Sequence, residues 1–344
     1  MNFNKIIKQN KPYIIAEIGI NHNGRINLAK KMIKIAKKIG ANCVKFQFFN
    51  AEKLISKYAP KAPYQKSNKK NTQLEIIKKC EMSLNDIKKL KSYSSKNKID
   101  FLCTPFDMES LINLLKIGVK CLKISSCNLN NIPLLEKVAE SKLPIFLSTG
   151  MGNLEEVNTA FKILKKNKLI IFQCTSNYPS NISDSNLAVL NIYKKKFGST
   201  LGYSDHTKSH TSALVALGMG VKIFEKHFTL SNKLKGIDQK ASLDVKNFKN
   251  YVKSINDGYQ AIGKSIKTPS SAEKKVLISL RKSLVAARDI KAGEKLTKNM
   301  ISFKRPGNGI ETKYLKNILG KVIKKNILYD KPFRKSHFYH TKFK

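Results

Sequence analysis

The feature that most constrains the fold is a repeated alternation of strand-like and helix-like segments over the first 260 residues of this 344-residue chain. Short runs rich in β-branched and aromatic residues recur eight times, and helical periodicity separates them. We expect strands at residues 13–17, 43–48, 100–104, 121–124, 145–148, 169–173, 200–204 and 221–224. Because an open doubly wound sheet rarely needs eight such even units, the pattern predicts an α/β fold of the closed (β/α)₈ barrel type.

Helices are expected between these strands, and one follows the last of them. Their predicted ranges are 26–39, 84–96, 108–116, 133–141, 154–166, 185–197, 209–220 and 245–262. One insert, residues 50–79, interrupts the rhythm and is expected to be a long loop after the second strand.

The character of the chain changes after the barrel, which we assign to residues 1–263. Residues 264–280 carry Pro269, Ser270 and Ser271 among charged residues, which indicates a linker. Short alternating runs at 282–287, 301–304 and 322–327 follow, separated by glycine-containing turns. Residues 281–344 are therefore expected to form a small β-rich domain.

A net charge of +43 raises the possibility of binding to nucleic acid or to an anionic membrane. Only five of the 66 basic residues are arginine, whereas readers of DNA grooves depend on bidentate arginine. The lysines are spread along the whole chain and form no basic patch. We therefore expect no nucleic-acid partner, and a basic nucleic-acid-binding protein stays as an alternative class.

Neither a membrane span nor a signal peptide is expected. The apolar run at residues 13–20 is interrupted by Glu17, and no other stretch resembles a span. The six cysteines form no C-x-x-C pair, and most lie in apolar strand-like runs, as reduced core residues do. A cytoplasmic protein is the expectation.

Polar side chains occur where the predicted strands end, which is the face that carries chemistry in such barrels. They are Glu17, Lys45, Gln47, Thr104, Lys123, Ser126, Ser148, Thr149, Thr175, Ser176, Tyr178, Ser204, His206 and His227. An unpaired buried ammonium is costly unless an anion meets it, so lysines at the ends of buried strands indicate a phosphate or carboxylate site.

The histidines His206 and His227 follow two successive predicted strands. Parallel neighbours lie only ~5 Å apart, so the two imidazoles are expected to meet over one point and to hold a metal with open positions for substrate. The alternative is two unrelated histidines, one capping a helix and one hydrogen-bonded in the core.

Several ordered motifs resemble the sialic acid synthase family, which includes synthases of N-acetylneuraminic, legionaminic and pseudaminic acids. In the barrel they are IAEIGINHNG (15–24), VKFQ (44–47), TPFD (104–107), LSTGM (147–151), CTSNYP (174–179), GYSDHT (202–207) and EKHFT (225–229). The segments VAARDIKAGE (285–294) and KRPGNG (304–309) are similar to the family's C-terminal antifreeze-like (SAF) domain. The resemblance covers nearly the whole chain.

The resemblance implies condensation of phosphoenolpyruvate with an N-acetylated amino-sugar aldehyde, N-acetylmannosamine or a 2,4-diacetamido relative, to a nine-carbon 2-keto acid and phosphate. It implies that His206 and His227 hold a divalent metal, Mn²⁺ or in its place Mg²⁺ or Co²⁺, as a Lewis acid on the aldehyde oxygen. Glu17 is implied to orient water or the sugar hydroxyls, and Asp238 to bind the sugar. Lys45, Gln47, Thr104, Lys123, Ser126, Ser176, Tyr178 and Ser204 are expected to bind the substrates.

The KRPGNG loop of the family reaches into the active site of the partner subunit in a swapped homodimer. By resemblance, Arg305 would contact the acyl amino end of the sugar in trans. Taken alone, Arg305 would be read as an exposed turn residue.

Two residues depart from the family pattern. After the fourth strand the family has Ser-x-Glu, whereas this chain has Ser126-Cys127-Asn128, and Gln239 stands where relatives often carry histidine. An asparagine hydrogen-bonds but takes up no proton at neutral pH. A catalytically weakened family member is therefore a further alternative to the active synthase, in which Asn128 is expected to be a catalytic-site residue.

Overall fold

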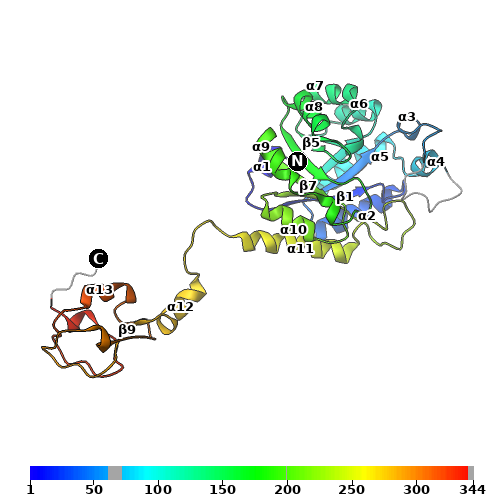
Figure 1. Cartoon of the computed structure of the whole chain (residues 1–344). Coiled ribbons are helices and arrows are strands. Elements are labelled where there is room, and N and C mark those ends of the chain that lie inside the picture. The colour runs from blue at the N-terminus through cyan, green and yellow to red at the C-terminus, as the bar shows by residue number, and fades with distance from the viewer. Residues whose placement is uncertain (61–71, 199, 340–344) are drawn as a thin grey trace. The chain divides into compact units, whose positions relative to one another are not determined.

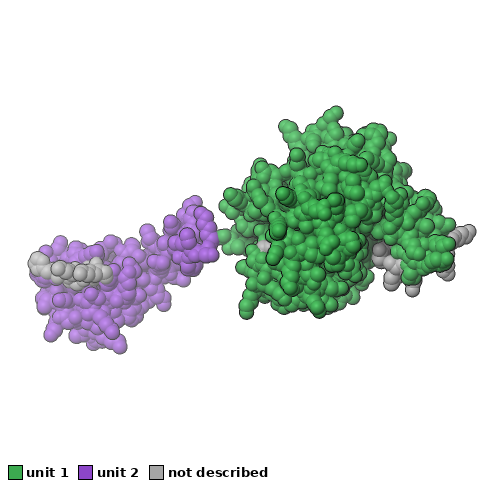
Figure 2. Space-filling model, turned by 90° about the horizontal axis from the view of Figure 1, so that it is seen from above, with its two compact units in different colours: residues 1–263 green, residues 264–344 purple. Residues whose placement is uncertain are grey.

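The computed structural model describes residues 1–60, 72–198 and 200–339 of the chain (Figure 1). The chain is divided into two compact units, residues 1–263 and residues 264–344 (Figure 2). Residues 61–71 of the predicted insert loop and residues 340–344 of the predicted small domain lie outside the described part. Among the described helices, none combines the length and the apolar character needed to cross a membrane.

Eight parallel strands of the first unit form a nearly closed barrel, which confirms the predicted fold class. Their order is β3-β2-β1-β8-β7-β6-β5-β4, and β3 and β4 at the two ends of this order lie next to each other. The strands are β1 (Tyr13–Gly19), β2 (Cys43–Phe48), β3 (Asp100–Pro105), β4 (Leu122–Ile124), β5 (Ile145–Ser148), β6 (Leu169–Cys174), β7 (Thr200–Asp205) and β8 (Ile223–His227).

Helices cover the outside of the barrel, as predicted, with ends shifted by a few residues. They are α2 (Ile26–Lys38), α5 (Leu84–Lys96), α6 (Met108–Lys116), α7 (Ile132–Glu140), α8 (Leu154–Leu164), α9 (Val189–Phe197), α10 (Thr211–Gly218) and α11 (Val245–Ile262). In α2 the buried residues Ala29, Met32, Ile33 and Ala36 recur at helical spacing, so one stripe of the helix faces the strands.

A short helix that the sequence did not predict, α1 (Phe3–Lys8), lies at the amino-terminal ends of the strands. Its buried Phe3 meets the ring of Phe146 edge to face, with ring centroids 5.8 Å apart. Phe3 and Ile6 join a cluster of buried apolar residues from β1 to β8 that includes Phe146 and Phe172. This end of the barrel is therefore filled by apolar packing, which leaves the carboxyl end for the polar residues.

The insert after β2 contains two short helices, α3 (Ala51–Leu54) and α4 (Gln73–Lys78), so its described parts are not only loop. Reciprocal hydrogen bonds between Thr72 and Glu75 cap the start of α4. Both helices pack against a small apolar cluster that contains Ile20 and Phe49. The insert is thereby held beside the carboxyl end of the barrel.

The second unit has a small core of its own around Leu284, Ile323 and Phe333. Its sheet has two antiparallel strands, β9 (Ser283–Ala286) and β10 (Ile301–Lys304), and the third predicted run makes only isolated bridges. Ten residues of the predicted linker form α12 (Ser271–Leu280), because Ser270 and Glu273 cap its first turn. The remaining short elements are η2 (Ser126–Asn128), η3 (Ser183–Ser185), η4 (Lys298–Met300), η5 (Thr312–Tyr314), α13 (Leu315–Ile318) and η6 (Lys335–His337).

Candidate active site

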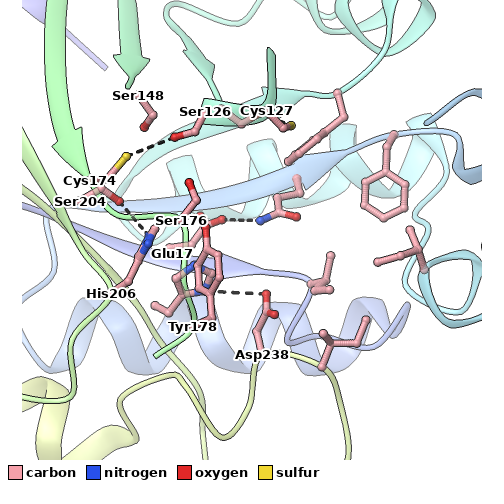
Figure 3. Close-up of a pocket in the computed structure, with 18 of the residues that line it drawn as sticks. Glu17, Ser126, Cys127, Ser148, Cys174, Ser176, Tyr178, Ser204, His206 and Asp238 are labelled. Carbon is pink, nitrogen blue, oxygen red and sulfur yellow. Dashed lines mark hydrogen bonds and ion pairs between the residues drawn. The ribbon is translucent and has the colours of Figure 1, made fainter. Parts of the chain in front are cut away.

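A cavity of about 680 Å³ opens at the carboxyl end of the barrel (Figure 3). It collects side chains from seven of the eight strands, all but β3, and from the loops that follow the strands. Eleven residues predicted for the site line it: Glu17, Lys45, Gln47, Lys123, Ser126, Ser176, Tyr178, Ser204, His206, His227 and Asp238.

The two-residue period of the strands explains which side chains reach the cavity. In β8, Glu225 and His227 share the inner face, and Lys226 between them points to the opposite face. Along β7 and the residue after it, Ser204 and His206 line the cavity in the same way. The register pairs Ser204 with Glu225, so these inner residues lie side by side.

Glu225 is the central charge of the site, and the sequence analysis did not single it out as a functional residue. One carboxylate oxygen lies 2.8 Å from the ammonium of Lys123, and the other lies 3.6 Å from that of Lys45. Ser204 also donates a hydrogen bond of 3.0 Å to this carboxylate. Glu225 thus lies between both predicted anion-binding lysines and keeps their ammonium groups apart.

Glu17 forms a second ion pair with Lys45. Its carboxylate lies 3.0 Å from the ammonium of Lys45 and accepts a hydrogen bond of 2.9 Å from Gln47. Thr104 also accepts a hydrogen bond from Lys45, at 3.3 Å, and lies behind the lysine, outside the cavity lining.

The pKa values show how burial and charge compete among these groups. Burial alone would raise the pKa of Glu225, but the ammonium groups of Lys123 and Lys45 lower it to about 2. For Lys45, the attraction of Glu17 and Glu225 outweighs burial and raises the pKa. For Lys123, burial outweighs Glu225 and lowers the pKa. The charge on Lys123 therefore depends most on its ion pair with Glu225.

The two histidines meet in the cavity, as their positions after β7 and at the end of β8 predict. Their ring centroids are 5.5 Å apart. Burial lowers the pKa of His206 to about 4 and that of His227 well below its usual value, so both imidazoles are neutral at pH 7. The ring of Tyr178 lies against both, with centroids 4.3 Å from His206 and 5.3 Å from His227.

These histidines fit a divalent metal that takes most of its ligands from water or substrate. The Nδ1 atom of His206 lies 2.6 Å from the carbonyl of Thr175, which orients the ring as backbone carbonyls do for metal-bound histidines. The buried Nδ1 atom of His227 has no hydrogen-bond partner and lies 3.9 Å from a carboxylate oxygen of Asp238. Within residues 1–60, 72–198 and 200–339, no cluster of three or more potential ligands forms.

A polar cradle lies at the ends of β4 to β6. The backbone N–H of Gly150 donates to the hydroxyl of Ser126 at 3.0 Å. A Cβ atom on Gly150 would lie 2.5 Å from the Ser176 hydroxyl and 2.9 Å from that of Ser126. Glycine is therefore required for the two hydroxyls to approach the backbone here.

Apolar side chains form much of another part of the lining. They are Ile20 and Phe49 after β1 and β2, Phe106 after β3, Leu54 and Ile77 of the insert helices, and Ile237, and the insert adds the polar Ser56 and Gln73. Glu17 and Gln47 line the cavity next to Lys45, and Asp238 lines it near His227. Burial, with the negative charge of Glu17, raises the pKa of Asp238 to about 7. The cavity lining thus has an ionic end, a polar part and a largely apolar wall.

Besides Thr104, two residues predicted for the site do not line the cavity. Asn128 ends the η2 turn, which directs its buried side chain to the carbonyls of Pro105 and Phe106 at 3.4 and 3.5 Å. Its neighbours Ser126 and Cys127 face the cavity instead. Arg305 belongs to the second unit and follows β10. The structure therefore places Asn128 next to the cavity lining and not in it, and its catalytic role stays a prediction.

A parallel eight-stranded barrel that gathers paired lysines, paired histidines and carboxylates at the carboxyl ends of its strands has the architecture of an enzyme. Residues 32–267 match the NeuB family, and residues 281–338 match the SAF domain. The chain is 42% identical over 331 residues to N,N'-diacetyllegionaminic acid synthase of Campylobacter jejuni, which covers 94% of this chain and 99% of the relative. The chain belongs to the NeuB family.

Two further comparisons give lower identities. The mouse N-acetylneuraminate-9-phosphate synthase is 35% identical over 296 residues, covering 85% of this chain and 82% of the relative. The crystal structure of an N-acetylneuraminic acid synthetase from Leptospira borgpetersenii is 36% identical, with a TM-score of 0.69, and covers 77% of this chain and 90% of that chain.

Proposed function

We propose that this enzyme condenses phosphoenolpyruvate with an N-acetylated amino-sugar aldehyde, forming a nine-carbon 2-keto acid and inorganic phosphate. Carbon 3 of phosphoenolpyruvate bonds to the aldehyde carbon, water adds at carbon 2, and phosphate departs. The convergence of Lys45, Lys123, His206 and His227 on one cavity supports this reaction more than any other observation. These residues supply cationic groups for a substrate that carries both a phosphate and a carboxylate, beside neutral imidazoles.

The ionic end of the cavity suits phosphoenolpyruvate. Lys45 and Lys123 are held by carboxylates, so their ammonium groups are in place before an anion arrives. The hydroxyls of Ser126 and Ser176 at the Gly150 cradle are donors for phosphate oxygens. Such preorganised donors lose little conformational freedom on binding.

The histidines would hold the divalent metal, for which we propose Mn²⁺, with Mg²⁺ or Co²⁺ as substitutes. When bound, the ion would polarise the aldehyde oxygen as a Lewis acid. Glu17, Gln47 and Asp238 then serve to orient the sugar hydroxyls and the water. After exhaustive dialysis against chelator, phosphate release should stop and should return on addition of Mn²⁺. Undiminished turnover in excess chelator would contradict the metal requirement.

The apolar wall favours an acceptor that carries methyl groups. A 2,4-diacetamido-2,4,6-trideoxymannose presents a 6-methyl and two acetyl methyls, whereas N-acetylmannosamine presents hydroxyls at positions 4 and 6. A hydroxyl left unpaired against an apolar wall costs about 1–3 kcal/mol, which is a roughly 5- to 160-fold loss of binding. The higher identity to the legionaminic acid synthase points to the same acceptor.

Phosphate release with each sugar tests both parts of the proposal. We expect turnover to require phosphoenolpyruvate and sugar together, with kcat/KM higher by at least about tenfold for the diacetamido sugar. A preference for N-acetylmannosamine would contradict the acceptor, and no turnover with either sugar would contradict the condensation.

A matched pair of variants in α4 tests the wall itself. Ile77 lines the cavity, whereas Leu74 packs in the same apolar cluster away from it. Ile77→Ser should reduce the preference for the diacetamido sugar, and Leu74→Ser should leave it unchanged. Equal effects of the two variants would mean that the wall does not contact the acceptor.

We also propose that the enzyme works in the cytoplasm as a homodimer. All six cysteines are free, which suits a reducing compartment. The swapped arrangement implied by the family resemblance would bring Arg305 to the sugar bound by the partner subunit.

A further inference from the structure

A buried ion pair lies behind the two histidines, on the outer face of the strands that carry them. A carboxylate oxygen of Asp205 is 2.9 Å from the ammonium of Lys226, and the two side chains are 0% and 1% exposed. Each partner directly precedes a histidine in the sequence, Asp205 before His206 and Lys226 before His227. The register places Asp205 opposite Lys226, so the pair links β7 to β8 where both strands end.

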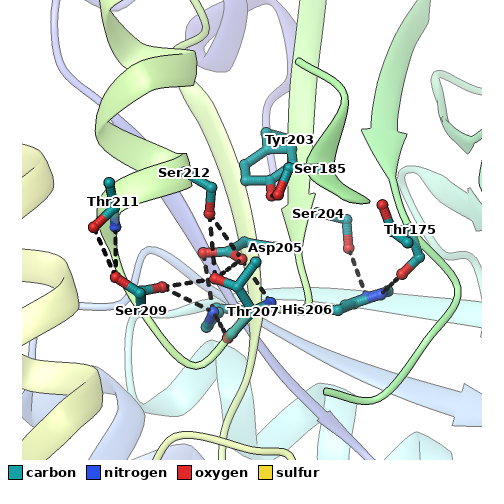
Figure 4. A network of polar contacts seen from close by, with 11 residues as sticks. Thr175, Ser185, Tyr203, Ser204, Asp205, His206, Thr207, Ser209, Thr211 and Ser212 are labelled. Atoms are coloured by element: carbon teal, nitrogen blue, oxygen red, sulfur yellow. Dashed lines mark hydrogen bonds and ion pairs between the residues drawn. The ribbon is translucent and has the colours of Figure 1, made fainter. Parts of the chain in front are cut away.

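The same pair holds the loop that follows β7, and Figure 4 shows Asp205 beside Thr207 of this loop. Asp205 accepts hydrogen bonds of 2.9 and 2.8 Å from the backbone N–H and the hydroxyl of Thr207. Lys226 donates to the carbonyl of Thr207 and, at 3.4 Å, to that of Ser209. The ammonium of Lys226 also lies 5.3 Å from the ring centroid of Tyr251 in α11. The backbone on either side of His206 is therefore tied to β8.

Stability alone is a weak reason for such a pair. Two buried charges lose their hydration, and replacing a buried ion pair by neutral residues of similar volume is often neutral or stabilising. The ion pair instead holds the backbones of β7 and β8 together at the residues next to the two histidines.

We infer that Asp205 and Lys226 are positioning residues that set the separation of His206 and His227 for metal binding. This role rests on the metal centre of the proposed function. Neither residue contacts the cavity, since both point to the opposite face of their strands.

The test is the affinity of the full chain for Mn²⁺, measured from the electron paramagnetic resonance signal of the free ion. The double variant Asp205→Asn/Lys226→Met removes both charges, keeps similar volumes and keeps an acceptor for Thr207. Residues that orient metal-bound histidines typically contribute 10–100-fold to metal affinity. We expect the dissociation constant for Mn²⁺ to rise by about that factor.

Leu164→Ala is the control for general loosening of the barrel. Leu164 is buried in the last turn of α8, away from β7 and β8. This variant should lower the thermal midpoint and leave Mn²⁺ affinity unchanged. If the double variant does not fold, Lys226→Arg is measured instead, because it keeps both charges of the buried pair and changes only the geometry of their contact.

The measured Mn²⁺ affinities distinguish a failure of the positioning role from a failure of the metal centre. Wild-type Mn²⁺ affinity in a folded variant, or an equal loss in Leu164→Ala, would overturn the positioning role and leave the metal centre intact. Failure of the wild-type chain to bind Mn²⁺, Mg²⁺ or Co²⁺ would overturn both.

Discussion

The ammonium of Lys123 lies 2.8 Å from a carboxylate oxygen of Glu225, and both side chains are almost completely buried. Lys123 comes from β4 and Glu225 from β8, so the contact crosses the inside of the barrel. The ammonium also lies 4.2 Å from the ring centroid of Phe172, in the apolar layer below. An anion entering the cavity therefore meets a lysine whose position is already fixed.

Glu225→Gln removes the charge and keeps the size of the side chain. Because it leaves a buried ammonium without a counter-charge, we expect the free energy of unfolding to fall by about 3 kcal/mol. Phosphoenolpyruvate affinity should also fall, since burial already lowers the pKa of Lys123. Chemical unfolding and calorimetric titration measure the two effects.

The control is Asp257→Asn, which breaks the exposed ion pair with Lys253 on α11 and should change little. The double variant Glu225→Gln/Lys123→Met should regain much of the lost stability without regaining affinity for phosphoenolpyruvate. Wild-type affinity in Glu225→Gln would contradict the role assigned to this carboxylate.

Gly150→Ala tests the cradle. The added methyl would lie 2.5 Å from the Ser176 hydroxyl and 2.9 Å from the Ser126 hydroxyl, so at least one must move. We expect KM for phosphoenolpyruvate to rise by roughly tenfold or more, because small displacements of binding groups are costly. Gly218→Ala in α10 is the matched control, with no atom within 4 Å of the new methyl. Steady-state kinetics of both variants measure this KM. An unchanged KM for phosphoenolpyruvate in Gly150→Ala would show that the cradle does not bind the phosphate.

Asn128→Glu tests the departure from the family pattern. Asn128 donates toward two backbone carbonyls, and a carboxylate placed there would face their oxygens. We expect kcat to change by less than tenfold and the thermal midpoint to fall. A general base typically contributes ~10²–10⁴ in rate, so a rise in kcat of tenfold or more would identify wild type as the catalytically weakened form.

Mixing two inactive variants tests the swapped dimer. Arg305→Ala and His206→Ala subunits each lack one component of the proposed site. In a swapped dimer each mixed pair contains one intact site, so part of the activity should return after subunit exchange. Exchange demonstrated by mass spectrometry, with no return of activity, would show that each site is completed within one chain.

The barrel and most of the cavity residues were predictable because strand ends are visible in the sequence. Lys45 and Lys123 interrupt the apolar runs of β2 and β4, and the two histidines stand after β7 and at the end of β8. Parallel strands bring such positions to one end of a barrel. Glu225 was not predicted as a site residue because the eighth strand was expected to end at Phe224. The observed strand continues to His227, which gives Glu225 an inward position.

Helix α12 was expected to be linker because Pro269 precedes it, although its capping box of Ser270 and Glu273 is visible in the sequence. Other features depend on contacts that local patterns do not reveal. The Asn128 side chain is oriented by the short turn η2 and by its contact with the backbone carbonyl of Pro105, which is distant in the sequence. The ion pair between Asp205 and Lys226 could be predicted only with knowledge of the register between β7 and β8.

In the proposed reaction, carbon 3 of phosphoenolpyruvate bonds to the sugar aldehyde, and phosphate leaves by cleavage of the bond between its bridging oxygen and carbon 2. Phosphoenolpyruvate labelled with ¹⁸O at the bridging oxygen tests both halves in one reaction with the diacetamido sugar. Mass spectrometry should find the nine-carbon 2-keto acid and ¹⁸O-labelled phosphate in equal amounts. Unlabelled phosphate with pyruvate and unchanged sugar would contradict the account.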